Sequence, residues 1–289
     1  MNALTVVDLL IAGVLTGMLY GLMALGLSVI FGVVRVVNFA HGEMMTIAMY
    51  ATVVLFGTLG LDPFFAVVPV AVAFFFLGYL LQRGLINPFI TRPEHSQFML
   101  LVALAIILVN VLLMVFGPDA QHVQLDYLLE PVEAGPLLLD RGKLAAAAVA
   151  AATAIALFLF FRYTLTGKAI RACADNHLGA LVIGLDVKRL YALTFGLGAA
   201  CVAVAGCMMI LLVDVTPTLG PSYTLLAFVI VIVGGLGSMP GALLGGVLIG
   251  VSEALAGLLI APSAKSMFTF ALLIVVLLLR PQGLLGKSV

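Results

Sequence analysis

Long apolar runs, each ended by a short polar segment, are the main pattern of this chain. Runs without a charged residue recur at about the 20-residue length that crosses a lipid bilayer as a helix. The clearest of them are residues 9–34, 44–61, 96–116, 144–161 and 190–213. This pattern predicts an all-α polytopic membrane protein that forms a single transmembrane domain over residues 1–289.

The composition agrees with that pattern. Of the 289 residues, 64% are hydrophobic and only 9% are charged, whereas about 25% of the residues in a soluble domain are charged. The formal net charge is zero, so a nucleic-acid partner has no electrostatic support and is not expected. The first residues lack the basic region of a signal peptide, which favours an uncleaved first span. Cys173, Cys201 and Cys207 form no CxxC pair, and we expect them to serve packing.

The distribution of charge predicts the orientation in the membrane. The segment between Gly117 and Asp140 carries five acidic residues and no Lys or Arg. Because basic loops stay in the cytoplasm, we expect an external loop at residues 117–141, a cytoplasmic loop at residues 162–189, an external N-terminus and a cytoplasmic C-terminus. About nine spans, within a range of eight to ten, satisfy this arrangement. The basic residues expected on the cytoplasmic side are Arg83, Arg92, Arg162, Lys168, Arg171, Lys188, Arg189, Arg280 and Lys287.

A glycine-rich segment divides residues 215–252, a charge-free run that is too long for one span. Gly234, Gly235 and Gly237 are followed by Pro240. Glycine and proline weaken a helix, so either a tight inner turn or a broken, re-entrant helix fits, and such segments often mark a transporter's pathway. Small residues at four-residue steps predict close helix packing, and they include Gly241, Gly245, Gly246, Gly250 and Ala254.

The cytoplasmic loop at residues 162–189 is too polar for a span and predicts two short amphipathic helices. Thr166 can cap the first helix, Asp175 or Asn176 can cap the second, and Gly184 can end it in a left-handed conformation. These helices would form either a docking surface or a connector that lies on the membrane. Their apolar faces contain Ile170, Ala174, Leu178, Leu181 and Val182.

Residues 35–44, RVVNFAHGEM, place polar side chains between two apolar runs. On one helix Asn38 and His41 would share a face, but Glu43 would point away, with Gly42 between them. Either this is an interfacial inner turn, or the helix is broken there and the polar groups line or support a pathway. For the broken form, we expect Asn38 and His41 to face one partner surface and Glu43 to face another.

Catalytic and nucleotide-binding motifs are missing from the sequence. Neither HExxH nor GxSxG occurs, and the GLLGKS of residues 283–288 lacks the first glycine of a phosphate-binding loop. We therefore expect no enzyme activity, no metal and no cofactor in this chain. Glu253 is the clearest charge in the C-terminal half, and it either reaches toward the outer boundary or lines a pathway.

Three stretches resemble a known family. They are GLMALGLSVIFGVVRVVNFAHGEMM, RACADNHLGALVIGLDVKRLYALTFGLGAA and VIVGGLGSMPGALLGGVLIGVSEAL. They are similar to the inner-membrane permeases of branched-chain amino acid ABC importers of the LivH type, in the same order over nearly the whole chain. The combination of NFAHGE and GGLGSxPGAxxGG is specific to these permeases.

The resemblance implies the partners of an importer in the bacterial inner membrane. These are a second, related permease, two cytoplasmic ATPases that hold ATP and magnesium, a substrate-binding protein outside, and the surrounding lipid. The external loop is then either the docking site of the binding protein or a solvated connector. The positions that match the family's ATPase-coupling helix are Ala172, Asn176, Ala180 and Gly184, flanked by Arg171 and Asp175.

The solute implied by the resemblance is a branched-chain amino acid. Importers of urea or short amides share similar Asn-x-Ala-His-Gly-Glu segments and remain an alternative. Leu226 also stands where some members have a lysine before Ala227 and Phe228. An ion-coupled carrier that works alone is an alternative of another class. The candidate pathway residues are Asn38, His41, Gly42, Glu43, Gly234, Gly235, Gly237 and Glu253.

Overall fold

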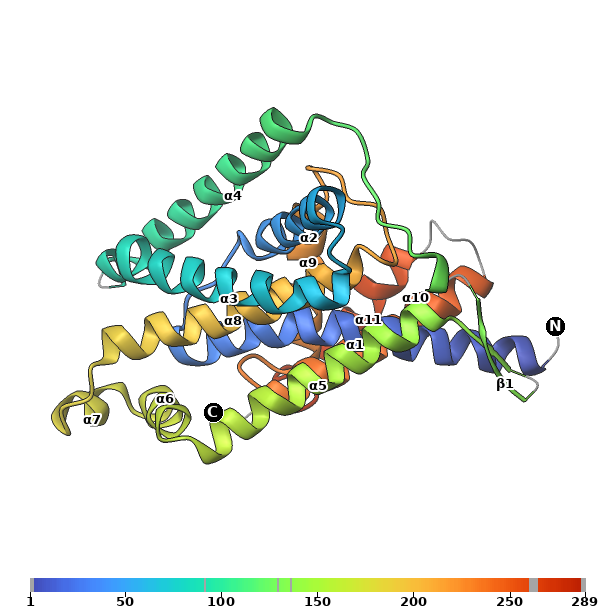
Figure 1. Cartoon of the computed structure of the whole chain (residues 1–289). Coiled ribbons are helices and arrows are strands. Elements are labelled where there is room, and N and C mark those ends of the chain that lie inside the picture. Colours follow the sequence, from blue (N-terminus) through green and yellow to red (C-terminus); the bar gives the residue numbers. More distant parts are fainter. Residues whose placement is uncertain (1–2, 91, 129, 136, 260–264, 287–289) are drawn as a thin grey trace.

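The computed structural model describes residues 3–90, 92–128, 130–135, 137–259 and 265–286. Most of these residues are helical (Figure 1). The longer helices are α1 (Ala3–Val34), α2 (His41–Leu59), α3 (Pro63–Leu81), α4 (Glu94–Phe116), α5 (Arg141–Tyr163), α8 (Val187–Met209), α9 (Gly220–Gly234), α10 (Met239–Leu259) and α11 (Lys265–Leu279). The shorter elements are η1 (Gln82–Ile86), η2 (Asn87–Phe89), η3 (Asp126–Leu128), β1 (Val132–Ala134), β2 (Leu137–Leu139), α6 (Leu165–Asp175) and α7 (His177–Val182).

The prediction of about nine spans is consistent with the structure. Among the described residues, seven helices are long and apolar enough to cross a membrane, and α9 and α11 are shorter apolar helices. Three of the helices are capped by the aspartate that precedes them. The side chain of each aspartate accepts a hydrogen bond from a backbone N–H in the first helical turn: Asp62 for α3, Asp140 for α5 and Asp186 for α8. Such caps satisfy donors that a helix start would otherwise leave unpaired.

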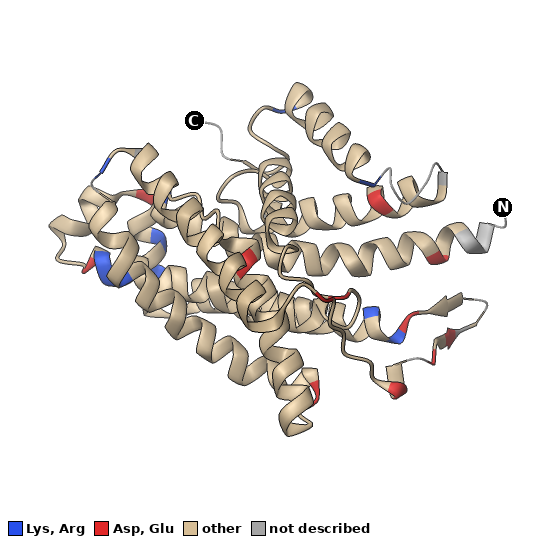
Figure 2. Ribbon diagram, turned by 90° about the horizontal axis from the view of Figure 1, so that it is seen from above, with Lys and Arg blue, Asp and Glu red and all other residues tan. Residues whose placement is uncertain are grey.

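The charged residues lie mainly at the two ends of the helical body (Figure 2). One end carries the turn from α3 to α4 and the α6–α7 loop, and the other carries the acidic segment between α4 and α5. Lys287 lies outside the described residues. This separation of charge agrees with the predicted loops.

The segment between α4 and α5 adds a short strand pair to the helical fold that was predicted. β1 and β2 form a small antiparallel hairpin in which Val132 pairs with Leu139. The same segment contacts two distant connections: Tyr127 donates a hydrogen bond to the Asp62 carboxylate before α3, and Gln121 pairs with Val215 before α9. The paired strand edges satisfy backbone groups that a helix would satisfy internally.

Helices α1–α3 and α8–α10 are arranged as two interlocked halves. The third helix of each half packs along the first helix of the other, α3 on α8 and α10 on α1. The first helices cross at Gly26 and Gly198, where an added Cβ on either residue would lie within 2.7 Å of the other's backbone oxygen. Close contacts of this kind require small residues in a membrane.

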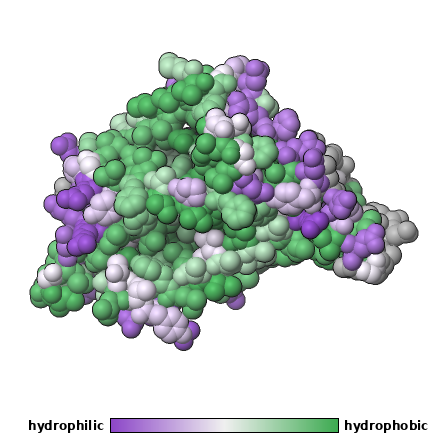
Figure 3. Space-filling view, in the orientation of Figure 1, coloured by the Kyte–Doolittle hydropathy of each residue, from purple (hydrophilic) through white to green (hydrophobic). Residues whose placement is uncertain are grey.

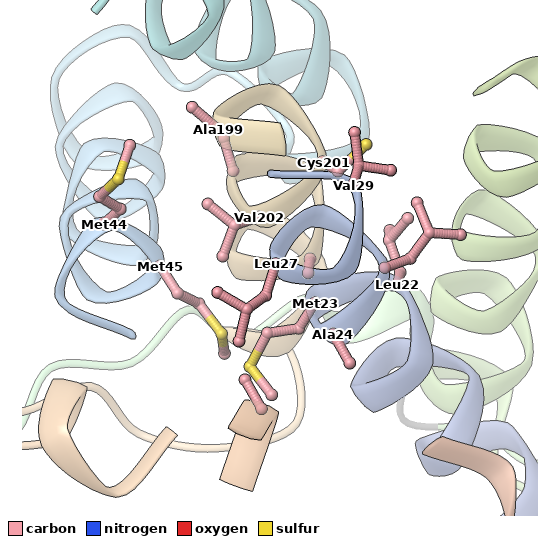
Figure 4. Close-up of a cluster of buried hydrophobic side chains, with 14 of the residues drawn as sticks. Leu22, Met23, Ala24, Leu27, Val29, Met44, Met45, Ala199, Cys201 and Val202 are labelled. Atoms are coloured by element: carbon pink, nitrogen blue, oxygen red, sulfur yellow. The ribbon is translucent and has the colours of Figure 1, made fainter. Parts of the chain in front are cut away.

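The stripes of small residues predicted for close packing do have that function. A Cβ on Gly246 would lie 2.3 Å from the backbone nitrogen of Gly21, and one on Gly250 would lie 2.4 Å from the Gly13 oxygen. Side chains of α1, α2 and α8 form a buried core beside these contacts (Figure 4). All three cysteines are buried, as expected for a packing role, and burial raises the pKa of the Cys173 thiol in α6.

The glycine-rich segment forms a tight turn between α9 and α10. Gly235 and Gly237 have φ angles of 105° and 76°, which side chains with a Cβ rarely adopt. Gly234 packs against Gly241, Gly235 packs against Gly286, and Gly237 packs against Gly32 at the end of α1. The turn therefore joins α1, α9, α10 and the C-terminal segment.

Candidate functional site

The chain is broken between α1 and α2, as the sequence allowed. α1 ends at Val34, Arg35 has a φ of 57°, and α2 begins at His41. The break precedes His41, so Asn38 lies on no helical face, and Gly42 lies inside α2. Gly42 permits a close contact between helices.

The start of α2 lies deep beside α1. The Nε2 of His41 is 2.9 Å from the carbonyl oxygen of Met23, eleven residues before the end of α1 at Val34. At a rise of about 1.5 Å per residue, that level is roughly 16 Å from the end of α1. The irregular residues 35–40 therefore return into the membrane-spanning part of the molecule, where backbone of this kind must be buried or line a cavity.

The start of α9 meets the start of α2. A Cβ on Gly42 would lie 2.0 Å from the backbone oxygen of Gly220, and a Cβ on Gly220 would lie 2.9 Å from the Cα of Glu43. Two helices of opposite halves thus begin at one point in the interior. The positive ends of both helix dipoles are directed toward this point.

Thr224 connects the two helix starts. The backbone N–H of Gly42 donates to its Oγ1 at 2.8 Å. The hydroxyl can donate to the Glu43 Oε2 at 3.0 Å or to the Phe39 carbonyl oxygen at 3.3 Å. Because the hydroxyl has one proton, it favours the nearer carboxylate oxygen, with which a charge-assisted bond is stronger.

Asn38 and His41 are fully buried and make other contacts. The Oδ1 of Asn38 accepts from the backbone N–H of Ala40 at 3.1 Å, and its amide lies 3.7 Å from the sulfur of Met44. His41 contacts α1, whereas Glu43 contacts α9. Thus Asn38 holds the bend, and His41 and Glu43 join α2 to two different helices.

A cavity of about 540 Å³ lies beside this junction. Glu43 provides the single charged side chain among its described lining residues, and Thr224 and Asn110 are the other polar ones. An apolar cavity with a few convergent polar groups is the usual form of a small-molecule site. The apolar walls come from α4, α9 and the bend before α2, and they include Phe39, Val102, Ile106, Leu225 and Phe228.

The other candidate pathway residues lie elsewhere. Gly234, Gly235 and Gly237 are at the far end of α9, and none of them lines the cavity. Glu253 accepts hydrogen bonds from the Tyr20 hydroxyl at 3.2 Å and the Thr269 hydroxyl at 3.1 Å. It joins α1, α10 and α11, and these bonds leave both positions expected for it open.

Residues 162–189 contain the two short helices that the sequence predicted, α6 and α7. The first cap is Thr164, which accepts from the Gly167 N–H at 3.0 Å, so the prediction of Thr166 was two residues late. Asn176 caps α7, and Gly184 has a φ of 82° after it.

Some residues of these two helices are buried and others are exposed. Ile170 and Ala180 are buried, so Ala180 cannot offer its side chain to a partner. Arg171, Ala172, Asp175, Asn176 and Gly184 are exposed. The apolar surface left open on and after α7 consists of Leu178, Leu181, Val182 and Ile183.

Sequence reasoning missed the partners of the NFAHGE segment. Thr224 stands 181 residues from Glu43, and Asn110 and Phe228 lie inside apolar runs. A threonine or asparagine in such a run was the available signal, because a polar group in a span must find a partner.

The fold and the site together define a helical membrane permease. Residues 9–277 match the family model for the branched-chain amino acid transport system permease component, and the chain belongs to this family. It is 31% identical to LivH of Salmonella typhimurium, a high-affinity branched-chain amino acid transport system permease protein, over 95% of this chain and 94% of that one. LivH of Escherichia coli K12 is 30% identical over the same shares.

Two further proteins are similar to this chain. BraD of Pseudomonas aeruginosa, also a high-affinity branched-chain amino acid transport system permease protein, is 30% identical over 96% of this chain and 95% of that one. PsaBC of Streptococcus pneumoniae, solved in complex with a Fab, aligns with 93% of this chain at 15% identity. The alignment covers 91% of the PsaBC chain, and its TM-score of 0.48 is too low to support an inference.

Proposed function

We propose that this chain is the permease subunit of an ATP-driven importer that moves branched-chain amino acids across the bacterial inner membrane. Family membership supports the transport role. The observation that supports this choice of solute is the cavity, where one carboxylate faces mainly apolar walls.

Each part of such a solute has a complementary group in this cavity. The Glu43 carboxylate pairs with the ammonium group, and the positive ends of α2 and α9 favour the carboxylate. The side chain contacts Phe39, Ile106 and Phe228. Urea lacks an apolar part to bury against these walls, so they favour an amino acid over urea.

Partner subunits complete the proposed transporter. Two cytoplasmic ATPases supply the energy, bind ATP and magnesium, and contact the exposed face of α6 and α7. A second, related permease shares the pathway. The external segment with its acidic residues faces a substrate-binding protein, so the N-terminus lies outside and the C-terminus in the cytoplasm.

Uptake by the reconstituted transporter tests the solute. The chain is purified with the ATPases, permease and binding protein that accompany it, placed in liposomes, and supplied with labelled leucine or labelled urea. We expect ATP-dependent leucine uptake, and at least a tenfold loss per assembled transporter in Glu43→Gln. Glu130→Gln, in the external segment, is the matched control. Preferred uptake of urea, or normal leucine uptake by Glu43→Gln, would contradict the proposal.

A second variant tests coupling. Arg171→Glu reverses the charge of an exposed side chain on α6, so leucine uptake and ATP hydrolysis should both fall while the subunits still assemble. Lys143→Glu, at the opposite end of the molecule, is the control. If Arg171→Glu transports and hydrolyses ATP normally, α6 is not the coupling contact.

A further inference from the structure

A second cavity lies at the C-terminal end of α3 and shares no lining residue with the proposed solute site. Its volume is about 830 Å³, and the walls come from the last turn of α3, the η1 and η2 turns, and the start of α8. Arg83, Lys188 and Arg189 contribute three cations, and Asp186 contributes the single carboxylate of the described lining. Charge complementarity therefore favours an anion.

The acidic side chain of this cavity already has a structural task. The Oδ1 of Asp186 accepts the backbone N–H of Arg189 at 3.1 Å and thereby caps α8. The side chains of Arg83, Lys188 and Arg189 are exposed. Arginine offers paired donors that match the oxygens of a phosphate, and lysine adds a positive charge.

The walls of the cavity are also held together by amide side chains. Gln82 donates to the Oδ1 of Asn87 at 3.0 Å, and Asn87 donates to the carbonyl oxygen of Lys188 at 3.3 Å. These bonds join the η1 turn, a short π-helix, to the start of α8. Local π-helical turns occur frequently at functional sites, and this one contributes Arg83 to the cavity that Lys188 and Arg189 also line.

An apolar stripe on α3 leads to this cavity. Five side chains along the helix are between 51% and 72% exposed, at spacings of three or four residues that put them on one face: Phe65, Val68, Val72, Phe76 and Leu80. Arg83 follows Leu80 by three residues, and Tyr79 lies at the boundary between stripe and cavity. Figure 3 shows hydrophilic residues gathered beside the hydrophobic surface at the end of the molecule where α4 and α8 begin.

We propose that this cavity binds the headgroup of an anionic phospholipid, with the acyl chains lying along the exposed stripe of α3. A basic pocket directly beside a lipid-facing surface, with a tyrosine at the boundary, matches the geometry of a phospholipid at the cytoplasmic leaflet. A soluble phosphate would use the cations but would leave the stripe without a role. The bound lipid fixes the α3–α8 contact next to the cytoplasmic loop.

Lipid binding to the intact transporter tests this assignment. The complex is purified with its partner subunits, stripped of lipid in detergent, and titrated with phosphatidylglycerol or phosphatidylcholine of identical acyl chains, with binding measured by native mass spectrometry. We expect phosphatidylglycerol to bind and phosphatidylcholine to bind at least tenfold more weakly. The double variant Arg83→Gln, Arg189→Gln should lose at least tenfold in affinity for phosphatidylglycerol. Arg162→Gln, Lys168→Gln removes two charges at the same end outside the cavity and should bind as the wild type does.

Each remaining outcome overturns the proposal. Equal phosphatidylglycerol binding by the cavity variant and the wild type would place the lipid elsewhere. Displacement of phosphatidylglycerol by millimolar glycerol phosphate or inorganic phosphate would identify a site for a soluble anion. Loss of the ATPase subunits from the cavity variant, with lipid binding unchanged, would identify a protein contact.

Discussion

The starts of α2 and α9 have the same position in their halves of the molecule but different chemistry. Each follows an irregular connection that enters the interior, and each has a glycine where the two helices touch, Gly42 and Gly220. The α2 start provides buried Asn38, His41 and Glu43, whereas the α9 start provides one hydroxyl, Thr224, as its partner. The architecture is therefore paired, but the charged group comes from one half alone.

This difference explains why the polar segment is tolerated. A carboxylate in an apolar span needs a partner, and the second half supplies one hydroxyl that serves both Gly42 and Glu43. The helix ends give the site its positive field, and Glu43 gives it the opposite charge. Variants of the α2 start and the α9 start can test separately the close helix contact, the Thr224 hydroxyl and the Glu43 charge.

The largest effect should come from filling the contact between the two starts. In Gly42→Val the new Cβ would lie 2.0 Å from the Gly220 oxygen and 2.5 Å from the Thr224 nitrogen. Backbone atoms cannot move aside easily, so we expect a loss of more than about 3 kcal/mol in unfolding free energy. Gly57→Val is the control in the same helix, because a Cβ on Gly57 has no neighbour within 4 Å. Equal thermal stability of the two variants in detergent would refute the close contact.

Removing the hydroxyl of the second half should have the next largest effect. Thr224→Val keeps the side-chain shape but leaves the Gly42 N–H and the Glu43 carboxylate without this partner. Because two buried groups lose a partner, we expect the unfolding free energy to fall by about 2 to 4 kcal/mol. Thr224→Ser should restore most of it. The measurement is chemical unfolding in mixed micelles, and a stable Thr224→Val would show that the hydroxyl is dispensable.

Changing the charged residue of the first half should have a smaller effect on stability. Glu43→Leu leaves the Thr224 hydroxyl with one partner fewer, which should lower the unfolding free energy by about 1 to 3 kcal/mol. Glu43→Gln keeps an oxygen that can accept the hydroxyl proton of Thr224. Thermal unfolding should therefore rank Leu below Gln. The reverse order would mean that Glu43 is not held by Thr224.

The smallest effect should come from the hydrogen bond that joins η3 to the start of α3. Tyr127→Phe removes the hydrogen bond to Asp62, and this exposed bond contributes less than about 1 kcal/mol. Burial and the Asp62 carboxylate raise the pKa of Tyr127 to about 12. Its pKa is about 10 in an unfolded chain, so the stabilisation is complete below pH 10 and is lost as the pH rises through 12. A wild-type stability curve without this alkaline loss relative to Tyr127→Phe would contradict the contact.

The local parts of the site could be predicted, and the distant parts could not. The break before α2, the separate directions of His41 and Glu43, and the cap at Asn176 depend on neighbouring residues. Thr164 is the first cap in place of Thr166 because α6 begins at Leu165, only two residues after α5 ends at Tyr163. The tasks of Glu253 and Gly42 depend on helices far away in the sequence, which spacing cannot specify.

The sequence by itself determined the class, the approximate number of spans and the distribution of charged loops. Each follows from a local requirement, since a span needs about 20 apolar residues wherever it lies. The tertiary structure alone decided that α2 and α9 begin at one point, with Thr224 against Glu43 and Gly42 against Gly220. In a membrane nearly every helix surface is apolar, so the choice of neighbours depends on how closely small residues let particular helices approach.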